Sequence, residues 1–232
     1  MIKTAIILAG GLGKRLRPLT ETIPKPLLKI GKTTILSIII DSLIRNGFKK
    51  IIIATRYKSE RFKSEIPRLK KKYGNIEFFL SEEKKKLGTC GPIKLLIKKL
   101  PKKFLVINGD IITNLNINKL FGKFLKSKSK FLIVSKEIKT PFEFGKISIK
   151  RNKIFKIEEK PITKNKIIAG IYFLDIDCVR YIPDNLYFGM DDLIKLFLKK
   201  KLSLDTYLMK KEFWLDVGRQ ADYEKIKKKI SI

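Results

Sequence analysis

The segment that most constrains the fold is a short apolar run, Thr4–Leu8, followed at once by a glycine-rich loop. A strand that ends in glycines is typical of α/β proteins, in which such loops lie at the carboxyl end of the sheet. Glycine lets backbone N–H groups approach an anion, and a nearby guanidinium, here Arg15, can bind its oxygens. Lys25 stands between Pro24 and Pro26, which stiffen the backbone around a second cation. The segment therefore predicts a phosphate-binding loop.

Two common phosphate-binding loops are excluded by the spacing of these residues. The dinucleotide fingerprint requires G-x-G-x-x-G, whereas this chain has Gly10, Gly11 and Gly13. The Walker loop requires Ser or Thr after its Gly-Lys pair, and here Gly13 and Lys14 are followed by Arg15. An ordinary glycine-rich turn is the structural alternative, and the later Pro-Lys-Pro motif disfavours it.

Apolar runs alternate with helical patterns along the chain, which predicts an α/β fold with a mixed, mainly parallel central sheet. From about residue 140 shorter strands joined by turns indicate a small antiparallel insert. The two parts form a single domain, 1–232, with one half at 1–135 and the other at 136–232. The expected strands are 4–8, 50–54, 76–80, 104–108, 131–135, 146–149, 154–158 and 167–174, and the expected helices are 35–46, 60–72, 92–99, 118–126, 191–199 and 221–229.

The formal net charge is +31, from 53 basic and 22 acidic residues. Such a charge suggests a polyanionic partner, but the lysines are spread over many surface-type runs, and a charge run is usually a solvated face. The chain is also rich in Ile, Asn and Phe, which share A/T-rich codons with Lys, so genome composition accounts for the bias. We therefore expect no specific nucleic-acid partner, although the positive field should attract nucleotides and sugar phosphates.

The remaining composition points to a cytoplasmic protein that does not insert into a membrane. No apolar run reaches membrane-spanning length, and the N-terminus lacks the pattern of a signal peptide. The two cysteines, Cys90 and Cys178, show no metal-ligand spacing, and the chain has no histidine to complete a zinc site. Composition leaves open whether the protein is a homo-oligomer.

Several motifs along the chain resemble those of the sugar-1-phosphate nucleotidylyltransferases, also called NDP-sugar pyrophosphorylases. They occur in the family's order, and within the family they are most similar to mannose-1-phosphate and glucosamine-1-phosphate guanylyltransferases. The motifs are the loop 8–26 (LAGGLGKRLRPLTETIPKP), 82–92 (EEKKKLGTCGP), 104–110 (FLVINGD), 144–147 (FGKI), 157–161 (IEEKP), 169–172 (AGIY) and 214–219 (WLDVGR) with Asp222 and Tyr223.

The resemblance implies a Rossmann-like three-layer sandwich and a Mg²⁺-dependent reaction. A sugar 1-phosphate oxygen attacks the α-phosphate of a nucleoside triphosphate, pyrophosphate leaves, and an NDP-sugar forms. GTP is the favoured triphosphate, and the sugar is of the mannose, glucosamine or heptose type. A phosphate monoester, whose second pKa is about 6, is already mostly a dianion near neutral pH. The nucleophile therefore needs no general base, which fits a chain without histidine.

The resemblance also implies roles for individual residues. Arg15 would bind the β- and γ-phosphates and Lys25 the α-phosphate, while Asp110 and Asp216 would bind Mg²⁺. Lys160 would hold the phosphate of the sugar. The remaining nucleotide-binding residues would be Leu8, Ala9, Gly10, Gly11, Gly13, Glu82, Gly88 and Thr89, and the remaining sugar-binding residues would be Asn108, Gly145, Glu159 and Gly170.

Alternative interpretations remain at this stage. The chain could be an inactive NDP-sugar-binding subunit, although Arg15, Lys25, Asp110 and Asp216 are all retained. It could use UTP, CTP or dTTP, or belong to the molybdopterin-type or cytidylyl transferases. One departure from the family pattern is Lys86, which stands where proline is usual, so the loop that follows would be less rigid.

Overall fold

A seven-stranded sheet forms the centre of the protein, seen here in a computed structural model that describes residues 2–230. In β11 the chain runs antiparallel to both of its neighbours, and every other pair in the sheet is parallel. The mixed, mainly parallel sheet predicted from the sequence is thereby confirmed. Across the sheet the strands are β12 (Asp205–Met209), β8 (Phe131–Pro141), β11 (Ile162–Asp175), β6 (Lys103–Asn108), β1 (Thr4–Leu8), β4 (Lys50–Thr55) and β5 (Glu77–Glu82).

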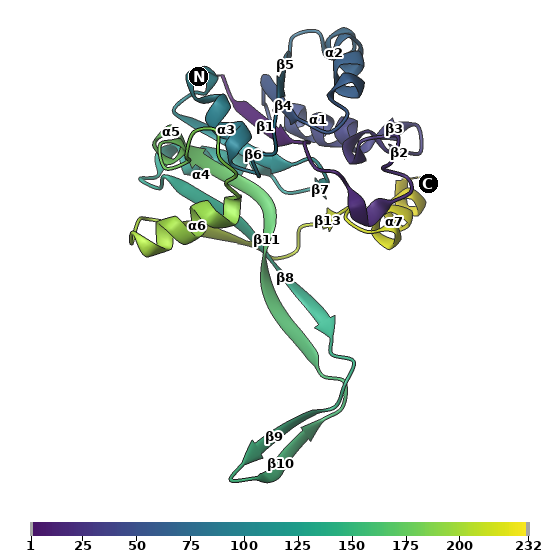
Figure 1. The fold of residues 1–232 in the computed structure, drawn as a ribbon, viewed down its shortest axis with the longest axis vertical. Helices are drawn as coiled ribbons and strands as arrows, with labels where there is room; N and C mark the ends of the chain where they lie inside the picture. The colour runs from purple at the N-terminus through teal and green to yellow at the C-terminus, as the bar shows by residue number, and fades with distance from the viewer. Residues whose placement is uncertain (1, 231–232) are drawn as a thin grey trace.

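Helices cover both faces of this sheet, which gives three layers (Figure 1). Neighbouring residues of one strand face opposite ways, so Ile6 and Ile7 of β1 belong to two different apolar clusters and are both fully buried. This explains why the strands are continuous apolar runs. One cluster includes α1 (Ile35–Arg45), α2 (Ser59–Tyr73), α4 (Ile117–Lys126) and α7 (Gln220–Ile230), and the other includes α3 (Gly91–Leu95), α5 (Ile176–Val179) and α6 (Met190–Lys199).

Most of the expected elements lie within a few residues of their observed bounds. The expected helix 92–99 is an exception, because it divides into α3 and a 3₁₀ turn, Ile97–Lys99. The sequence analysis also missed β12, α5 and two small pairs of strands that depend on distant partners or tight turns. In these pairs β7 (Ile111–Thr113) lies beside β13 (Trp214–Asp216), and β2 (Lys29–Ile30) lies beside β3 (Thr33–Thr34). Two further 3₁₀ turns occur at Lys14–Leu16 and Lys25–Leu27.

The antiparallel insert extends from the body as a long two-stranded arm (Figure 1). β8 and β11 are longer than predicted, and their outer parts carry a terminal hairpin of β9 (Lys146–Lys150) and β10 (Lys153–Glu158). We call residues 137–168 the arm; none of these residues is buried. Pairing between β8 and β11 extends both strands beyond the limits that their apolar patterns alone suggested.

Within the described part of the chain, no helix combines the length and apolar character needed to cross a membrane.

Candidate active site

The residues after β1 and β6 line a cavity of about 570 Å³ at the carboxyl edge of the sheet. Eleven of the predicted site residues meet there, including Arg15, Lys25 and Asp110. The position follows from the parallel arrangement of β1 and β6, which brings both carboxyl ends to one edge. The eleven are Leu8, Ala9, Gly10, Gly11, Gly13, Arg15, Lys25, Gly88, Thr89, Asn108 and Asp110.

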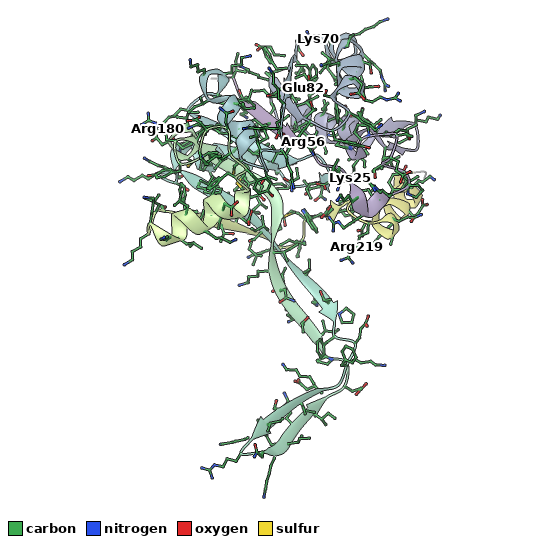
Figure 2. The ribbon with its side chains drawn as sticks, in the orientation of Figure 1. Lys25, Arg56, Lys70, Glu82, Arg180 and Arg219 are labelled. Carbon is green, nitrogen blue, oxygen red and sulfur yellow. The ribbon has the colours of Figure 1, made fainter. Side chains whose placement is uncertain are left out.

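The glycine-rich loop is held in shape by contacts on either side. Gly13 has a φ of 62°, and its carbonyl accepts a hydrogen bond from the Thr20 hydroxyl (Oγ1 to O, 2.9 Å). Lys25 begins a 3₁₀ turn whose first residues are fixed by the flanking prolines. The labelled Lys25 lies in the body of the molecule, away from the arm (Figure 2). The loop therefore presents Arg15 and Lys25 from a constrained backbone.

Asp110 and Asp216 reach the site from two strands that pair with each other. β7 follows Asp110 directly, and in the β7–β13 ladder Ile111 is the partner of Asp216. The backbone N–H of Val217 donates to the carbonyl of Asp110 (2.9 Å), which ties the two segments together. Sequence reasoning proposed both carboxylates, but only this pairing brings residues 106 positions apart into one site.

Each of these aspartates has a buried carboxylate oxygen, Oδ1, without a hydrogen-bond partner. Burial raises the pKa of Asp216, and the neighbouring charge of Asp110 raises it further. An unpartnered buried carboxylate oxygen is unfavourable unless a cation or proton binds it. The two Oδ1 atoms therefore fit a divalent cation such as Mg²⁺, which binds to one or two carboxylates and to substrate phosphate oxygens.

Two cations accompany the two carboxylates. The Lys25 ammonium forms an ion pair with Asp110 Oδ2, and both side chains are mostly buried. Arg15 approaches Asp216 across Gly218, since a Cβ placed on that glycine would lie 3.0 Å from both Arg15 Nη2 and Asp216 Oδ1. Any side chain at position 218 would separate the guanidinium from the carboxylate. The described residues contain no cluster of three or more His, Cys, Asp or Glu suited to a metal, so a cation here would also need ligand or water oxygens.

The glutamate that lines the cavity is Glu83, one position after the Glu82 named by sequence reasoning. Glu82 instead lies at the end of β5, where it accepts a hydrogen bond from Ser59 and pairs with Lys63 (2.7 Å). Glu83 is 6% exposed, and its Oε2 accepts from the backbone N–H of Leu87 (3.2 Å). The sequence motif contains both glutamates, and only burial distinguishes them.

Desolvation raises the pKa of Glu83 to about 7, although the nearby Arg56 and the Leu87 N–H oppose the shift. The carboxylate lies against Gly10, where a Cβ would come within 2.9 Å of Glu83 Oε1. Sequence reasoning also missed Arg56 and Tyr187, which line the same cavity with Lys86. Lys86 lies within the motif 82–92, which gave a signal for it, whereas Arg56 lies outside every motif of the sequence analysis.

The loop that contains Gly88 and Thr89 is anchored to the segment before α6. Gly88 has a φ of 78°, and a Cβ there would lie 2.5 Å from the carbonyl oxygen of Phe188. Thr89 Oγ1 accepts from the backbone N–H of Met190 (2.6 Å), and Cys90 N–H donates to the Phe188 carbonyl (3.0 Å). Only glycine fits at position 88, which explains this part of the motif.

The predicted sugar-binding residues divide into two groups. Asn108 lines the cavity, and Gly170 packs directly against it, since a Cβ on Gly170 would lie 2.7 Å from Asn108 Nδ2. Gly145, Glu159 and Lys160 instead lie together on the arm, outside the cavity lining. There a Cβ on Gly145 would lie 3.2 Å from Glu159 Oε2, and Lys160 has a φ of 45°, an unusual value for lysine.

Comparison with known proteins identifies the family of the chain. Residues 4–231 match the family model described as nucleotidyl transferase. The chain is 34% identical over 230 residues to a mannose-1-phosphate guanyltransferase of Yarrowia lipolytica and 33% identical to that of Saccharomyces cerevisiae. Each alignment covers 94% of this chain and 61% or 62% of the relative, so the chain spans about three fifths of the length of these relatives.

Solved structures of similar fold match nearly the whole length of the chain. HddC from Yersinia pseudotuberculosis superposes with a TM-score of 0.75 at 29% identity, covering 99% of this chain and 100% of HddC. HddC complexed with GMP-PN has the same TM-score at 27% identity and the same coverage of both chains. A putative glucose-1-phosphate thymidylyltransferase from Bacillus anthracis, at 24% identity and a TM-score of 0.78 over 98% of this chain and 94% of that one, shares the fold. The chain belongs to the nucleotidyl transferase family.

Proposed function

We propose that this protein transfers a guanylyl group from GTP to a sugar 1-phosphate, forming a GDP-sugar and pyrophosphate. The observation that carries the proposal is the pair of unpartnered carboxylate oxygens, on Asp110 and Asp216, beside Lys25 and Arg15. Such a group can bind a metal–triphosphate, and it lies next to a glycine-rich loop suited to phosphate oxygens. The guanylyltransferase relatives favour a sugar of the mannose type, with glucosamine- and heptose-type sugars as the alternatives.

In this proposal the two cations bind different parts of the triphosphate. Arg15 lies at the outer part of the glycine-rich loop and is exposed to solvent, where it can hold the β- and γ-phosphates. Lys25 lies deeper beside Asp110 and would stabilise the charge that develops on the α-phosphate. The pyrophosphate that leaves carries more charge than it did within the triphosphate, so Arg15 would mainly accelerate its departure.

Mg²⁺ bound between Asp110 and Asp216 would neutralise phosphate charge and orient the triphosphate for in-line attack. The Lys25–Asp110 ion pair would hold the Asp110 carboxylate in place beside the cavity. The attacking sugar phosphate is already a dianion near neutral pH, so no residue has to remove a proton from it. The sequence contains no histidine that could act as a general base.

We assign base recognition to Glu83. Guanine presents two adjacent donors, N1–H and N2–H, and a carboxylate can accept both at once. Besides Asp110, Glu83 is the one carboxylate in the described cavity lining, and its Oε2 already accepts a hydrogen bond from Leu87 N–H. Uracil, thymine and cytosine do not present this pair of donors, so Glu83 in its ionised form would favour GTP over UTP, dTTP and CTP.

Pyrophosphate release provides the test. Purified protein would be incubated with Mg²⁺, each nucleoside triphosphate, and mannose, glucosamine, glucose and heptose 1-phosphates in turn. We expect release with GTP and one of the mannose-, glucosamine- or heptose-type sugars, and loss of that release when EDTA removes Mg²⁺. Release with UTP, CTP or dTTP alone would refute the base assignment. Folded protein that binds GDP-sugar but releases nothing with any pair would instead be an inactive binding subunit.

A further inference from the structure

The proposed GTP site leaves one side of the guanine base without a partner. Guanine presents two donors, N1–H and N2–H, and two neighbouring acceptors, O6 and N7. Glu83 is a carboxylate, so in its ionised form it can serve the donors but not the acceptors. An acceptor that loses water and gains no hydrogen bond weakens binding, so a donor should lie beside Glu83. This step rests on the proposed function, because that function makes guanine the base.

The segment that follows β4 is the place where such a donor can lie. β4 runs between β1 and β5 in the sheet and is parallel to both, so its carboxyl end lies between the glycine-rich loop and the segment that carries Glu83. On one side the backbone N–H of Ala9 donates to the Ala54 carbonyl (2.7 Å). On the other side the Glu83 N–H donates to the Thr55 carbonyl (2.8 Å), and the next residue along the chain is Arg56.

Arg56 and Glu83 meet at Gly10. A Cβ placed on Gly10 would lie 2.9 Å from Glu83 Oε1 and 3.5 Å from Arg56 Cβ. Arg56 is half-buried and lines the same cavity as Glu83, and in Figure 2 it lies in the body of the molecule between Glu82 and Lys25. Burial raises the pKa of Glu83, and the positive charge of Arg56 opposes this rise. The neighbour of the proposed base-binding carboxylate is therefore a guanidinium with several N–H donors.

The backbone next to Arg56 is anchored, whereas its guanidinium is available to a ligand. The hydroxyl of Tyr57 donates to the carbonyls of Thr20 and Glu21 (3.1 and 3.0 Å), which ties the residue after Arg56 to the segment that follows the glycine-rich loop. No described residue forms a hydrogen bond or an ion pair with the Arg56 guanidinium. A donor presented from an anchored backbone loses less freedom when it binds than one on a mobile loop.

Two other cations of the described cavity lining, Lys14 and Lys86, have different surroundings. Lys14 begins the 3₁₀ turn of the glycine-rich loop, which is the part of the site proposed to hold phosphates. The ammonium of Lys86 lies over the ring of Tyr187, 5.1 Å from its centre, and so is held toward the segment before α6. Arg56 is thus the cation best placed to act together with Glu83.

We propose that Arg56 recognises guanine by donating to O6 and N7, while Glu83 accepts from N1–H and N2–H. A guanidinium that donates to O6 and N7 is the commonest base-specific contact to guanine in protein–DNA complexes. In adenine an amino group replaces O6 and N1 is an acceptor, so Arg56 would face a donor and Glu83 an acceptor. The two residues together therefore select GTP against ATP, through mismatched groups as well as matched ones.

Nucleotide analogues test this contact in the unaltered protein. Binding of GTP, 7-deaza-GTP, 6-thio-GTP and ITP would be measured by calorimetry with Mg²⁺ and without a sugar phosphate, so that no turnover is required. 7-Deaza-GTP lacks N7, 6-thio-GTP has the weaker acceptor sulfur in place of O6, and ITP lacks only the N2 amino group. We expect 7-deaza-GTP and 6-thio-GTP each to bind at least about fivefold more weakly than GTP. Equal affinity for GTP and both of these analogues would overturn the proposal.

Variants show whether Arg56 is the donor. In Arg56→Met the affinities for GTP and 7-deaza-GTP should become equal, and the preference for GTP over ATP should fall at least about tenfold. The ratio of GTP to ITP affinity should stay at its wild-type value, because that ratio depends on Glu83. Glu83→Gln should do the reverse, changing the GTP to ITP ratio and keeping the dependence on N7. If Arg56→Met weakened GTP, ITP and ATP equally, Arg56 would serve only the charge of the triphosphate and the proposal would be wrong.

Lys85→Met is the matched control, since Lys85 is exposed and lies outside the described cavity lining beside Lys86. It removes the same charge as Arg56→Met and should leave all of these affinities unchanged. Lys86→Met tests the rival cation, and loss of the N7 dependence in that variant instead of in Arg56→Met would overturn the assignment.

Pyrophosphate release with a sugar 1-phosphate, measured separately, distinguishes this inference from the proposed function. Protein that binds the analogues with the expected ratios but releases no pyrophosphate would overturn only the proposed transfer. Release from GTP that is accompanied by equal binding of GTP, 7-deaza-GTP and 6-thio-GTP would overturn only the role of Arg56.

Discussion

At the scale of single residues, the site depends on two carboxylate oxygens that the described protein leaves without hydrogen bonds. Asp110→Asn and Asp216→Asn each remove a charge that would bind Mg²⁺ but keep the size of the side chain. We expect either change to lower kcat at least about a thousandfold. For Asp216→Asn the melting temperature should stay the same or rise, because the change removes repulsion between two buried anions. For Asp110→Asn it should fall, because the mostly buried Lys25 loses its ion-pair partner.

Turnover and thermal unfolding of these variants would be measured side by side. Asp205→Asn is the matched control, since Asp205 is an exposed aspartate at the start of β12 and should leave both quantities unchanged. If Asp110→Asn kept near-normal activity, the assignment of Asp110 to the metal would be wrong.

The raised pKa of Glu83 leads to a separate prediction, about how the stability of the protein depends on pH. Its pKa is about 7 in the folded protein against an ordinary 4.5, so between these values the folded protein keeps a proton that the unfolded chain releases. The contribution of Glu83 to stability therefore falls as pH rises through this window, by about 3 kcal/mol in all. In Glu83→Gln the amide oxygen can still accept from Leu87 N–H, and this pH-dependent loss should disappear.

Urea unfolding without nucleotide, from pH 4.5 to pH 8, would measure the effect. The free energy of unfolding of the wild type should decrease relative to that of Glu83→Gln across the series. Parallel curves for the two proteins would show that Glu83 titrates at its ordinary pKa.

At the scale of elements, the loop before α3 depends on one glycine. Gly88→Ala would place a Cβ 2.5 Å from the Phe188 carbonyl oxygen on a backbone with φ 78°. We expect a loss of about 1–3 kcal/mol in unfolding free energy and a higher KM for the nucleoside triphosphate, because the loop would move away from α6.

A second glycine gives the opposite expectation. Gly122 lies inside α4, where an added Cβ would meet no atom within 4 Å, so Gly122→Ala should stabilise the protein by up to about 1 kcal/mol. Thermal unfolding of both variants would show whether local geometry decides the sign. Equal effects of the two changes would contradict the argument.

At the scale of the whole molecule, the formal net charge of +31 should produce nucleic-acid binding without specificity. Binding of this kind depends on counterion release and weakens steeply with salt. Fluorescence anisotropy with a duplex DNA of arbitrary sequence should show affinity falling about a thousandfold between 50 and 200 mM salt. Affinity that persists at 200 mM salt would show that the charge serves a nucleic-acid partner after all.

Much of the nucleotide side of the site could be predicted from the sequence because it is local. Gly10, Gly11, Gly13, Arg15 and Lys25 occur within one loop, and that loop's proximity to β1 follows from chain connectivity. The same reasoning fails for Glu82 and Glu83, because two neighbouring residues at the end of a strand point to opposite faces. Burial decides between them, and burial depends on the rest of the fold.

The sequence by itself determined the mainly parallel sheet, the glycine-rich loop and the identity of the charged groups, since each depends on residue type and short-range periodicity. Only the tertiary structure decided that Asp216 lies beside Asp110, because that proximity comes from pairing between β7 and β13. It also decided that Lys160 lies on an arm outside the cavity, since the length of β8 and β11 depends on their hydrogen bonds to each other. Contacts between distant segments have no signature in either segment alone, and in this protein those contacts complete the site.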